Sequence, residues 1–390
     1  MRAWRQKLTG QTWRAAALIG LITGSFSTLI SQLAAARMGR NAAVDWMVVA
    51  TIPIRDYALQ TDPSWGVILN GILFHQWADF SWALVFFGLL SRWTAGLTPL
   101  TLLLIAIPWG FFTSAVEWLF LVPLVPFWQP IFTLEQAYWL GLLVHLASAS
   151  LYPLYPGVRD WIAGQTPSPH RRFTIGWSGL AVMGLSGLGI LALMGWSGRE
   201  LPWVGREPGF DQSFMGNMTA HHAQGIAIAQ IATERSKDPH LRDISKLMVA
   251  AQKGEIAVFR QWWESWFRGS LADQPALHSM MQGMLTPAQV QSLRDAARAD
   301  FDALFVSLMT KHHQGAIAMA DEAMRRAADP RLKIMAHAIR HEQSGEIEMM
   351  RGTEGAEAVK AALASLLKPP ANGPPRAIPQ SHSSERQVSP

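Results

Sequence analysis

The sequence contains no cysteine. The protein can therefore form neither a disulfide bond nor a thiolate metal site. A site for a soft metal ion would have to be built from methionine and histidine, of which the chain has 17 and 12. Charge is also scarce, because Asp, Glu, Lys and Arg make up only 16% of the 390 residues. A soluble domain has about 25% charged residues, so we expect part of the chain to lie in a membrane.

Five stretches in the first half of the chain are nearly free of charge. A helix that crosses a bilayer needs about 20 apolar residues, and each stretch supplies them. The first is long and lacks a small-residue cleavage site, so we interpret it as an anchor rather than a signal peptide. The predicted spans are residues 15–36, 66–90, 97–122, 136–157 and 173–197.

Basic residues in the short loops indicate how these spans are oriented. With the N-terminus in the cytoplasm, eight Lys and Arg residues lie inside and three outside, which favours this orientation. Five crossings then place everything after Gly198 outside the cytoplasm, in the periplasm of a Gram-negative bacterium. Residues 199–390 carry 22 basic and 21 acidic side chains without a basic stripe, so we expect no nucleic-acid partner.

The second half of the chain contains an internal repeat. A shift of 91 residues aligns 210–260 with 301–351 without gaps, and 20 of 51 positions are identical. Each copy is predicted to form two helices, with Asp211 or Asp302 as the first N-cap and an Asp-Pro pair between the helices. Two such hairpins would bury their apolar faces in a four-helix bundle. Residues 199–366 are expected to form this domain, and the Pro/Ser-rich residues 367–390 a disordered tail.

Each copy carries a methionine followed three residues later by a histidine pair. At this helical spacing a thioether can meet an imidazole, and the two ligand types together favour Cu(I). The connector between the copies adds one histidine and three methionines within seven residues, although methionine also fills gaps in apolar cores. The predicted metal ligands are Met218, His221, His222, Met309, His312, His313, Met319, His278, Met280, Met281 and Met284.

The repeats resemble a known family. The run MQGMLTPAQVQSLRDAARADFDALFVSLMTKHHQGAIAMADEA, followed by HEQSGEIEMM, is similar to the bacterial domain of unknown function 305. This resemblance covers about residues 210–351 and implies a ferritin-like four-helix bundle, with copper handling in some exported members. It implies Met-x-x-His-His as the motif, with Gln252/Glu255 and Gln343/Glu346 on the facing helices. The first copy departs by having Ile228 where the second has Met319, so its site is expected to be weaker.

Two enzyme classes fit the sequence poorly. A di-iron carboxylate oxidase of the ferritin-like type needs Glu-x-x-His motifs, and the chain has none. It also lacks the His-Glu-x-x-His motif of a zinc hydrolase. Glu255 and Glu346 are more simply explained as hydrogen-bond partners of the facing histidines than as an iron site. We therefore expect a binding protein rather than an enzyme.

Ionisable residues also occur inside the predicted membrane half. Such groups are costly at membrane depth and are functional candidates by default. A metal or proton path, a haem or quinone site, and simple pairing that fixes helix packing are all compatible with the pattern. The residues are His75, Asp79, Glu117 and His145, which we assign to the metal candidates at lower rank.

These observations predict an all-α protein of the bacterial inner membrane. About five transmembrane helices would be followed by a periplasmic ferritin-like domain that binds copper, as Cu(I), for tolerance or trafficking. The expected partners are the metal ion, the lipid bilayer and periplasmic copper-handling proteins, with a homo-oligomer left open. One alternative is a transporter or redox protein working through the ionisable membrane residues, with the outer domain as metal donor or sensor. Another is a structural bundle that docks a partner.

Overall fold

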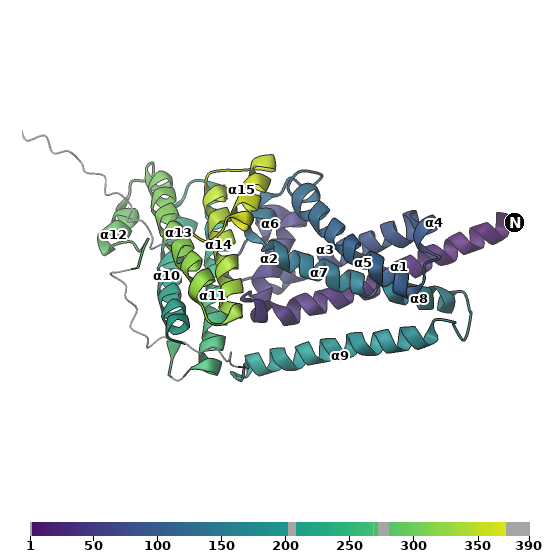
Figure 1. Cartoon of the computed structure of the whole chain (residues 1–390). Coiled ribbons are helices and arrows are strands. Elements are labelled where there is room, and N and C mark those ends of the chain that lie inside the picture. The colour runs from purple at the N-terminus through teal and green to yellow at the C-terminus, as the bar shows by residue number, and fades with distance from the viewer. Residues whose placement is uncertain (1, 202–207, 268, 272–280, 372–390) are drawn as a thin grey trace, which may run out of the picture.

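A computed structural model describes residues 2–201, 208–267, 269–271 and 281–371. Within these ranges every regular element is a helix, so the predicted all-α fold class is confirmed. An elongated bundle is formed by the helices before residue 200, and a second bundle by those from residue 208 on (Figure 1). The predicted connector residues His278 and Met280 lie outside the described residues, as does most of the predicted tail.

Long apolar helices build the first bundle. They are α1 (Arg2–Ala34), α2 (Ala42–Ile54), α3 (Trp65–Leu84), α5 (Pro99–Val116), α7 (Tyr138–Ser150) and α9 (Arg171–Trp196). Short α-helical elements connect them, namely α4 (Ser91–Thr94), α6 (Pro130–Glu135) and α8 (Tyr155–Ile162). Three segments are 3₁₀ helices, η1 (Ala35–Met38), η2 (Arg55–Ala58) and η5 (Tyr152–Leu154). Two are π-helices, η3 (Val85–Leu89) and η4 (Glu117–Leu121).

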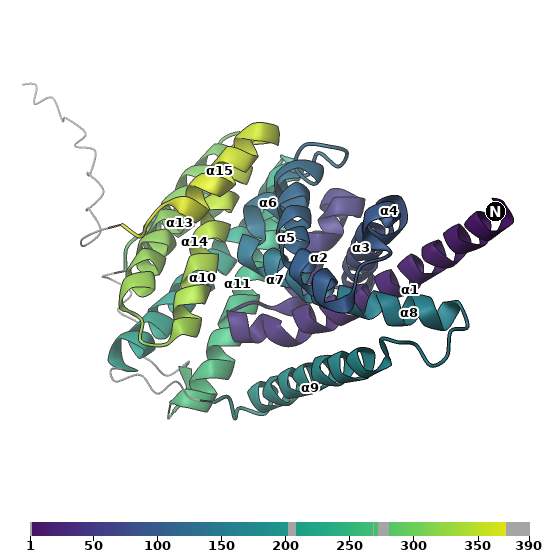
Figure 2. The same ribbon diagram turned by 45° about the vertical axis from the view of Figure 1, so that its right-hand side comes forward.

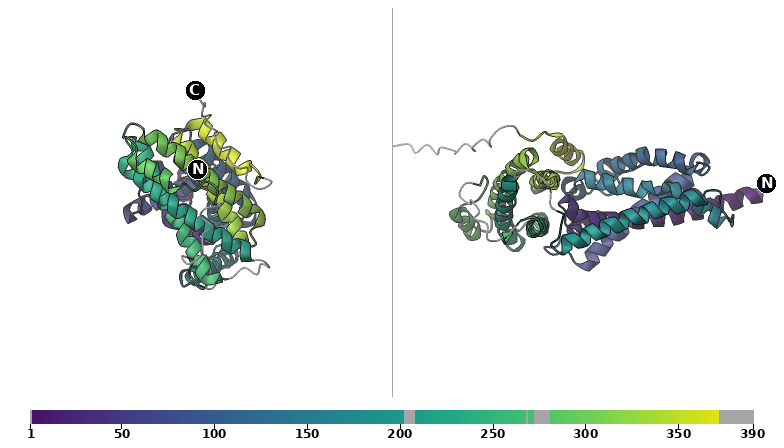
Figure 3. Two further views of the ribbon diagram at one scale, coloured as in Figure 1. Left: turned by 90° about the vertical axis from the view of Figure 1, so that its left-hand side faces the viewer. Right: turned by 60° about the horizontal axis from the view of Figure 1, so that its bottom comes forward.

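Four helices of the described residues are long and apolar enough to cross a membrane. They cover Gly10–Met38, Trp65–Leu89, Pro99–Leu121 and Arg171–Trp196. The last of these, α9, packs beside α1 and leaves most of its surface uncovered (Figure 3). The N-terminus lies at the end of the molecule away from the second bundle (Figure 1).

The segment predicted as a fourth span, residues 136–157, is not a single membrane-length helix. It is divided among α7, η5 and the start of α8. Pro153 and Pro156 explain the division, because each removes a backbone donor and disturbs the preceding helical turn. The helix α7 still packs against α1 and α5 within the bundle.

The second bundle consists of two helical hairpins. The first pairs α10 (Pro208–Arg235) with α11 (Pro239–Trp266), and the second pairs α13 (Phe301–Arg326) with α14 (Pro330–Met350). The two hairpins meet through α10 with α13 and α11 with α14, which makes a four-helix bundle. Two shorter helices, α12 (Pro287–Asp295) and α15 (Gly355–Leu367), pack on α13 and α14.

The predicted N-cap role of Asp211 and Asp302 is wrong. The helix α10 begins earlier, at Pro208, and α13 has Asp300 at its N-cap position. The Asp211 carboxylate instead accepts hydrogen bonds from the backbone of the opposite hairpin, at 2.9 Å from Asp329 N. Asp302 lies 3.3 Å from Asp238 N in the same way. The two carboxylates therefore tie each hairpin to the turn of the other.

The second bundle packs directly on the first. Its helices α11 and α14 face α2 and α6, as Figure 2 shows. Gly345 lies so close to the Leu134 backbone that a side chain there would collide with it. His341 Nε2 donates a hydrogen bond to Thr133 O at 3.2 Å. Tight backbone contact and buried polar pairing thus hold the two bundles together.

Candidate metal centre

Four histidines meet in the core of the second bundle. His221 and His222 come from α10, and His312 and His313 come from α13; all four are fully buried. The rings of His221 and His312 lie 3.8 Å apart, centroid to centroid, with a tilt of 31°. The two predicted histidine pairs therefore form one cluster where α10 and α13 pack together.

The outer histidine of each pair faces a carboxylate. His222 Nε2 lies 2.7 Å from Glu255 Oε2 on α11, and His313 Nε2 lies 2.7 Å from Glu346 Oε2 on α14. These are close polar contacts rather than well-aligned hydrogen bonds. Both carboxylates are buried, and each is 33 residues after its histidine, so the contact recurs with the 91-residue offset.

Burial keeps His221, His312 and His313 uncharged near neutral pH. It lowers the pKa of His221 to about 3, and repulsion from His222 contributes to this shift. Burial also lowers the pKa of His313 to about 3 and that of His312 well below its usual range. A neutral imidazole keeps one nitrogen lone pair, which is the form that a metal ion binds.

In the rings of His222, His312 and His313, Nε2 faces an oxygen atom and Nδ1 does not. His312 Nε2 lies 3.1 Å from the His221 backbone oxygen, so it carries the proton and donates. The Nε2 atoms of His222 and His313 face Glu255 and Glu346, each at 2.7 Å. The Nδ1 atoms of His222, His312 and His313 have no hydrogen-bond partner among the described residues. Three buried imidazole nitrogens are thus without a partner in the described part of the chain.

Methionines flank the histidines on both sides. Met218 and Met309 are fully buried one turn before His221 and His312. Met218 packs with Ala316 and Ala320 of α13, whereas Met309 belongs to the core that contains Ile228 and Ile231 of α10. Met215 is also fully buried, and the predicted ligand Met319 is half-buried beside the same core as Met218.

The described end of the connector lies against the cluster. The Gln282 backbone interacts with the His221 side chain. A side chain at Gly283 would collide with the backbone of His312 and Gly315. The predicted ligands Met281 and Met284 sit on either side of this contact and are half-buried.

Two glutamines complete the surroundings of the cluster. Gln252 is fully buried, and both polar atoms of its amide lack a hydrogen-bond partner among the described residues. It packs close to Gly225, whose missing side chain would also come within 2.9 Å of His312 Cε1. Gln343 is likewise buried with an unpartnered Oε1. Small residues and polar amides thus surround the imidazoles.

The described residues contain no group of three or more His, Asp or Glu side chains arranged to hold a metal ion. Thioethers are not among these residue types. The cluster therefore differs from a carboxylate-rich centre, and its unpartnered atoms are imidazole nitrogens next to methionines.

Two buried charges at the junction of the bundles are not predicted by any motif in the sequence. Glu135 on α6 is fully buried, and neither carboxylate oxygen has a hydrogen-bond partner among the described residues. Burial and the nearby Glu346 raise the pKa of Glu135 well above its usual range. Arg40 is also buried and pairs with both Asp45 and Glu342. One signal was present, because Glu135 is the only charge between residues 118 and 158.

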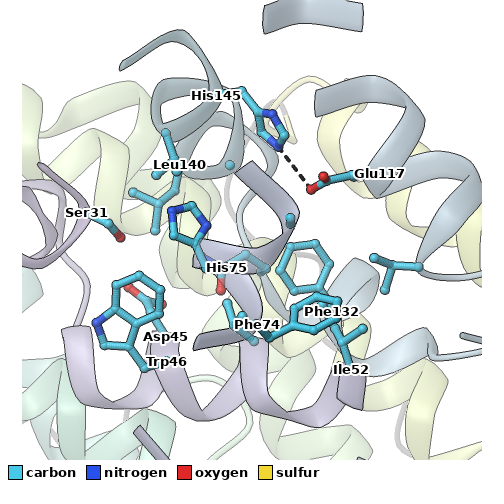
Figure 4. A pocket seen from close by; sticks show the side chains of 16 residues that line it. Ser31, Asp45, Trp46, Ile52, Phe74, His75, Glu117, Phe132, Leu140 and His145 are labelled. Atoms are coloured by element: carbon cyan, nitrogen blue, oxygen red, sulfur yellow. Dashed lines mark hydrogen bonds and ion pairs between the residues drawn. The ribbon is translucent and has the colours of Figure 1, made fainter. Parts of the chain in front are cut away.

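The ionisable residues of the membrane half form two pairs, and three of the four, His75, Glu117 and His145, line a cavity (Figure 4). His75 Nε2 is 3.6 Å from Asp79 Oδ2, one turn later on α3. His145 Nε2 is 3.1 Å from Glu117 Oε2, which joins α7 to η4. These four residues are far along the chain from the histidine cluster and do not belong to it.

The second bundle matches a known family. Residues 211–353 match the family described as Domain of unknown function (DUF305). No functionally curated protein matches the chain.

Solved structures of this family are also similar to part of the chain. A DUF305 fragment from Deinococcus radiodurans is 27% identical with a TM-score of 0.35, covering 39% of this chain and 97% of the fragment. A putative secreted DUF305 protein from Streptomyces coelicolor is 25% identical with a TM-score of 0.34, covering 37% and 94%. CopM in its Cu(I)-bound form is 32% identical with a TM-score of 0.31, covering 36% of this chain and 93% of CopM.

Proposed function

The chain belongs to the DUF305 family through residues 211–353, and from this premise we propose that it is a membrane-anchored protein that binds Cu(I) outside the cytoplasm. The ion would be held by Met218 and Met309 with the histidines of α10 and α13. Its role would be copper tolerance or trafficking.

The observation that carries this proposal is the set of unpartnered imidazole nitrogens in the core. A buried polar atom without a partner costs about 1–3 kcal/mol of stability. Three such atoms in one cluster therefore lower the free energy of unfolding of the metal-free protein substantially. A metal ion that accepts their lone pairs would remove this cost. Carboxylates beside the opposite nitrogen orient histidine ligands in many metal sites, and Glu255 and Glu346 occupy that position.

The ligand types support copper over other metals. Thioethers and imidazoles bind Cu(I) well, whereas Zn(II) and Fe(II) gain more from thiolates or clustered carboxylates. The chain offers no thiolate. CopM, whose sequence is related to residues of this bundle, has been solved with Cu(I), Cu(II) and Ag bound.

The helices of the first bundle support the proposed location. Apolar helices of membrane length support anchoring in a bilayer. The excess of basic residues in the loops expected to be cytoplasmic supports an inside N-terminus. The metal centre, at the other end of the molecule, would then face the periplasm.

Metal analysis of the purified full chain under reducing conditions tests the proposal. We expect Cu(I) or Ag(I) to bind more tightly than Zn(II) or Fe(II) in competition titrations. Replacing both His312 and His313 by glutamine should remove this binding while the helical circular dichroism stays nearly unchanged. Glu264→Gln, at an exposed position of α11, serves as the control.

Two results would count against copper binding. One is tighter binding of zinc or iron than of Cu(I). The other is a double-glutamine variant with unchanged Cu(I) affinity but a clearly lower melting temperature without metal, which would assign the histidines to the structural core.

A further inference from the structure

Two hydrogen-bonded groups face one another inside the membrane half. Between them lies a cavity of about 60 Å³, lined by His75, Glu117 and His145 (Figure 4). A water molecule needs about 10–15 Å³ of such space. The cavity therefore has room for a short chain of waters between ionisable side chains.

The first group joins α1 to α3. The Ser27 hydroxyl donates to Asp79 Oδ2, and its oxygen lies 2.9 Å from His75 Nε2. Because the Ser27 proton is given to Asp79, its oxygen is free to accept the proton on Nε2. The other ring nitrogen of His75, Nδ1, has no hydrogen bond to the described residues.

The second group joins α5, η4 and α7. His145 Nε2 lies 3.1 Å from Glu117 Oε2, and Nδ1 lies 2.9 Å from the Thr113 hydroxyl. The other oxygen of Glu117 accepts from Trp82 Nε1. A π-helical segment begins at Glu117, and such segments occur frequently at functional sites.

These groups are poorly suited to hold a metal ion. Both ring nitrogens of His145 are engaged, and so is Nε2 of His75. No methionine lines the cavity, and no group of three His, Asp or Glu side chains among the described residues is arranged for a metal. Alternating carboxylates, imidazoles and hydroxyls are instead the groups of intramembrane proton relays.

We propose that the membrane half conducts protons through this cavity. A proton that arrives through cavity water binds His75 Nδ1, and the ring releases the proton on Nε2 to Ser27, whose hydroxyl proton passes to Asp79. Across the cavity, Glu117 takes up and releases a proton while His145 holds its carboxylate in place. Each transfer breaks one O–H or N–H bond and forms another, so no oxidant or reductant is needed.

Charged and titratable groups extend the relay towards both ends of the bundle. On the side of the second bundle, Asp45 lines the cavity and pairs with Arg40. On the side of the N-terminus, Asp79 is close enough to Tyr152 of η5 to act on it electrostatically. His75 in turn lies within electrostatic reach of Glu117 and His145.

Proton flux into vesicles tests this inference. The full chain is reconstituted in liposomes with a pH-sensitive dye inside, and a potassium gradient with valinomycin drives proton movement. We expect flux clearly above that of protein-free vesicles and a loss of at least tenfold in Glu117→Gln. Ser27→Ala should also slow the flux, because it removes the hydroxyl that links His75 to Asp79 by hydrogen bonds without removing a charge. This second variant keeps the test valid if Glu117→Gln fails to fold.

Two variants at exposed positions serve as controls. Glu264→Gln and Arg351→Met should conduct protons like the unchanged protein. Wild-type flux equal to that of empty vesicles would overturn the inference, and so would full flux in both Glu117→Gln and Ser27→Ala. Neither result bears on the affinity of the second bundle for Cu(I).

Discussion

His221 and His312, which are 91 residues apart in the chain, place their rings 3.8 Å from one another in the core of the second bundle. Each belongs to a different hairpin. A contact this close brings the two histidine pairs into one cluster, so we expect one shared centre rather than two separate sites.

If the centre is shared, replacing either His221 or His312 should have the same effect on metal binding. We expect His221→Gln and His312→Gln each to lower the total amount of bound Ag(I) by more than half, because either change removes a ligand from the same centre. Metal content of the two purified variants checks this. Loss of half or less in either variant would instead indicate independent sites.

The methionines should set the choice of metal. Met218→Leu combined with Met309→Leu keeps the core volume, and such changes usually cost less than about 1.5 kcal/mol. We expect Cu(I) affinity to fall at least tenfold, about 1.4 kcal/mol, with Zn(II) affinity unchanged. Competition titration measures both. Met335 is buried on α14 against Gly39, and Met335→Leu should leave both affinities unchanged. An equal loss of Cu(I) affinity in Met335→Leu would show that core packing, not thioether ligation, causes the effect.

Buried neutral histidines make the metal-free protein sensitive to acid. Burial lowers the pKa of His341 to about 3, below the value near 6.5 of an unfolded histidine. The unfolded chain therefore binds protons first, and the free energy of unfolding falls as the pH drops from about 6.5 towards 3. At pH 5 this one residue should account for on the order of 2 kcal/mol.

Replacing His341 by glutamine checks this pH dependence. Glutamine does not titrate and can still donate to the Thr133 oxygen. Unfolding curves between pH 7.5 and 5 should show a smaller loss of stability in this variant than in the unchanged protein. An identical loss in both would show that His341 is not responsible for any of it.

Arg40 should hold the two bundles together. It is buried and pairs with Asp45 and Glu342, so Arg40→Met would leave two buried carboxylates without a cation. Removal of one partner from a buried ion pair costs about 3–5 kcal/mol. Arg351→Met is the control, because its exposed pair with Glu348 should contribute only about 0–1 kcal/mol. Equal melting temperatures for the two variants would contradict a role for Arg40 in stability.

The orientation in the membrane can be read with reporters. A reporter that works only in the periplasm, fused after Leu367, should be active, because the basic loops favour an N-terminus in the cytoplasm. The same fusion with a reporter that works only in the cytoplasm should be inactive. Activity of the cytoplasmic reporter would overturn both the orientation and the exposure of the centre to periplasmic copper.

Periodicity and the repeat were enough to predict the helical class and the ends of several helices. The Asp-Pro pairs predict a break between the two helices of each hairpin, and the first helices end shortly before these pairs, at Arg235 and Arg326. These signals act locally, because an Asp-Pro pair interrupts a helix regardless of what the helix packs against. The DUF305 resemblance was also stated from the motif and is confirmed by the family match at residues 211–353.

Other features depended on long-range packing and could not be predicted. No local pattern indicated that Glu135 would meet Glu346, since the two are more than 200 residues apart. Asp211 looks like an N-cap because it precedes an apolar helical run, yet its carboxylate is used by the opposite hairpin. The interruption of the fourth predicted span was not predicted either. Residues 136–157 are apolar enough for a membrane helix, but Pro153 and Pro156 divide them among α7, η5 and α8.

The crossed contacts of Asp211 and Asp302 have a consequence for how this domain is assembled. Each carboxylate accepts from the turn of the other hairpin, so neither turn is completed by residues of its own copy. The arrangement is that of a homodimer whose two subunits have been joined in one chain. A single hairpin cut from this protein should therefore be incomplete alone and should pair with a second copy of itself, restoring between two molecules what the duplication provides within one.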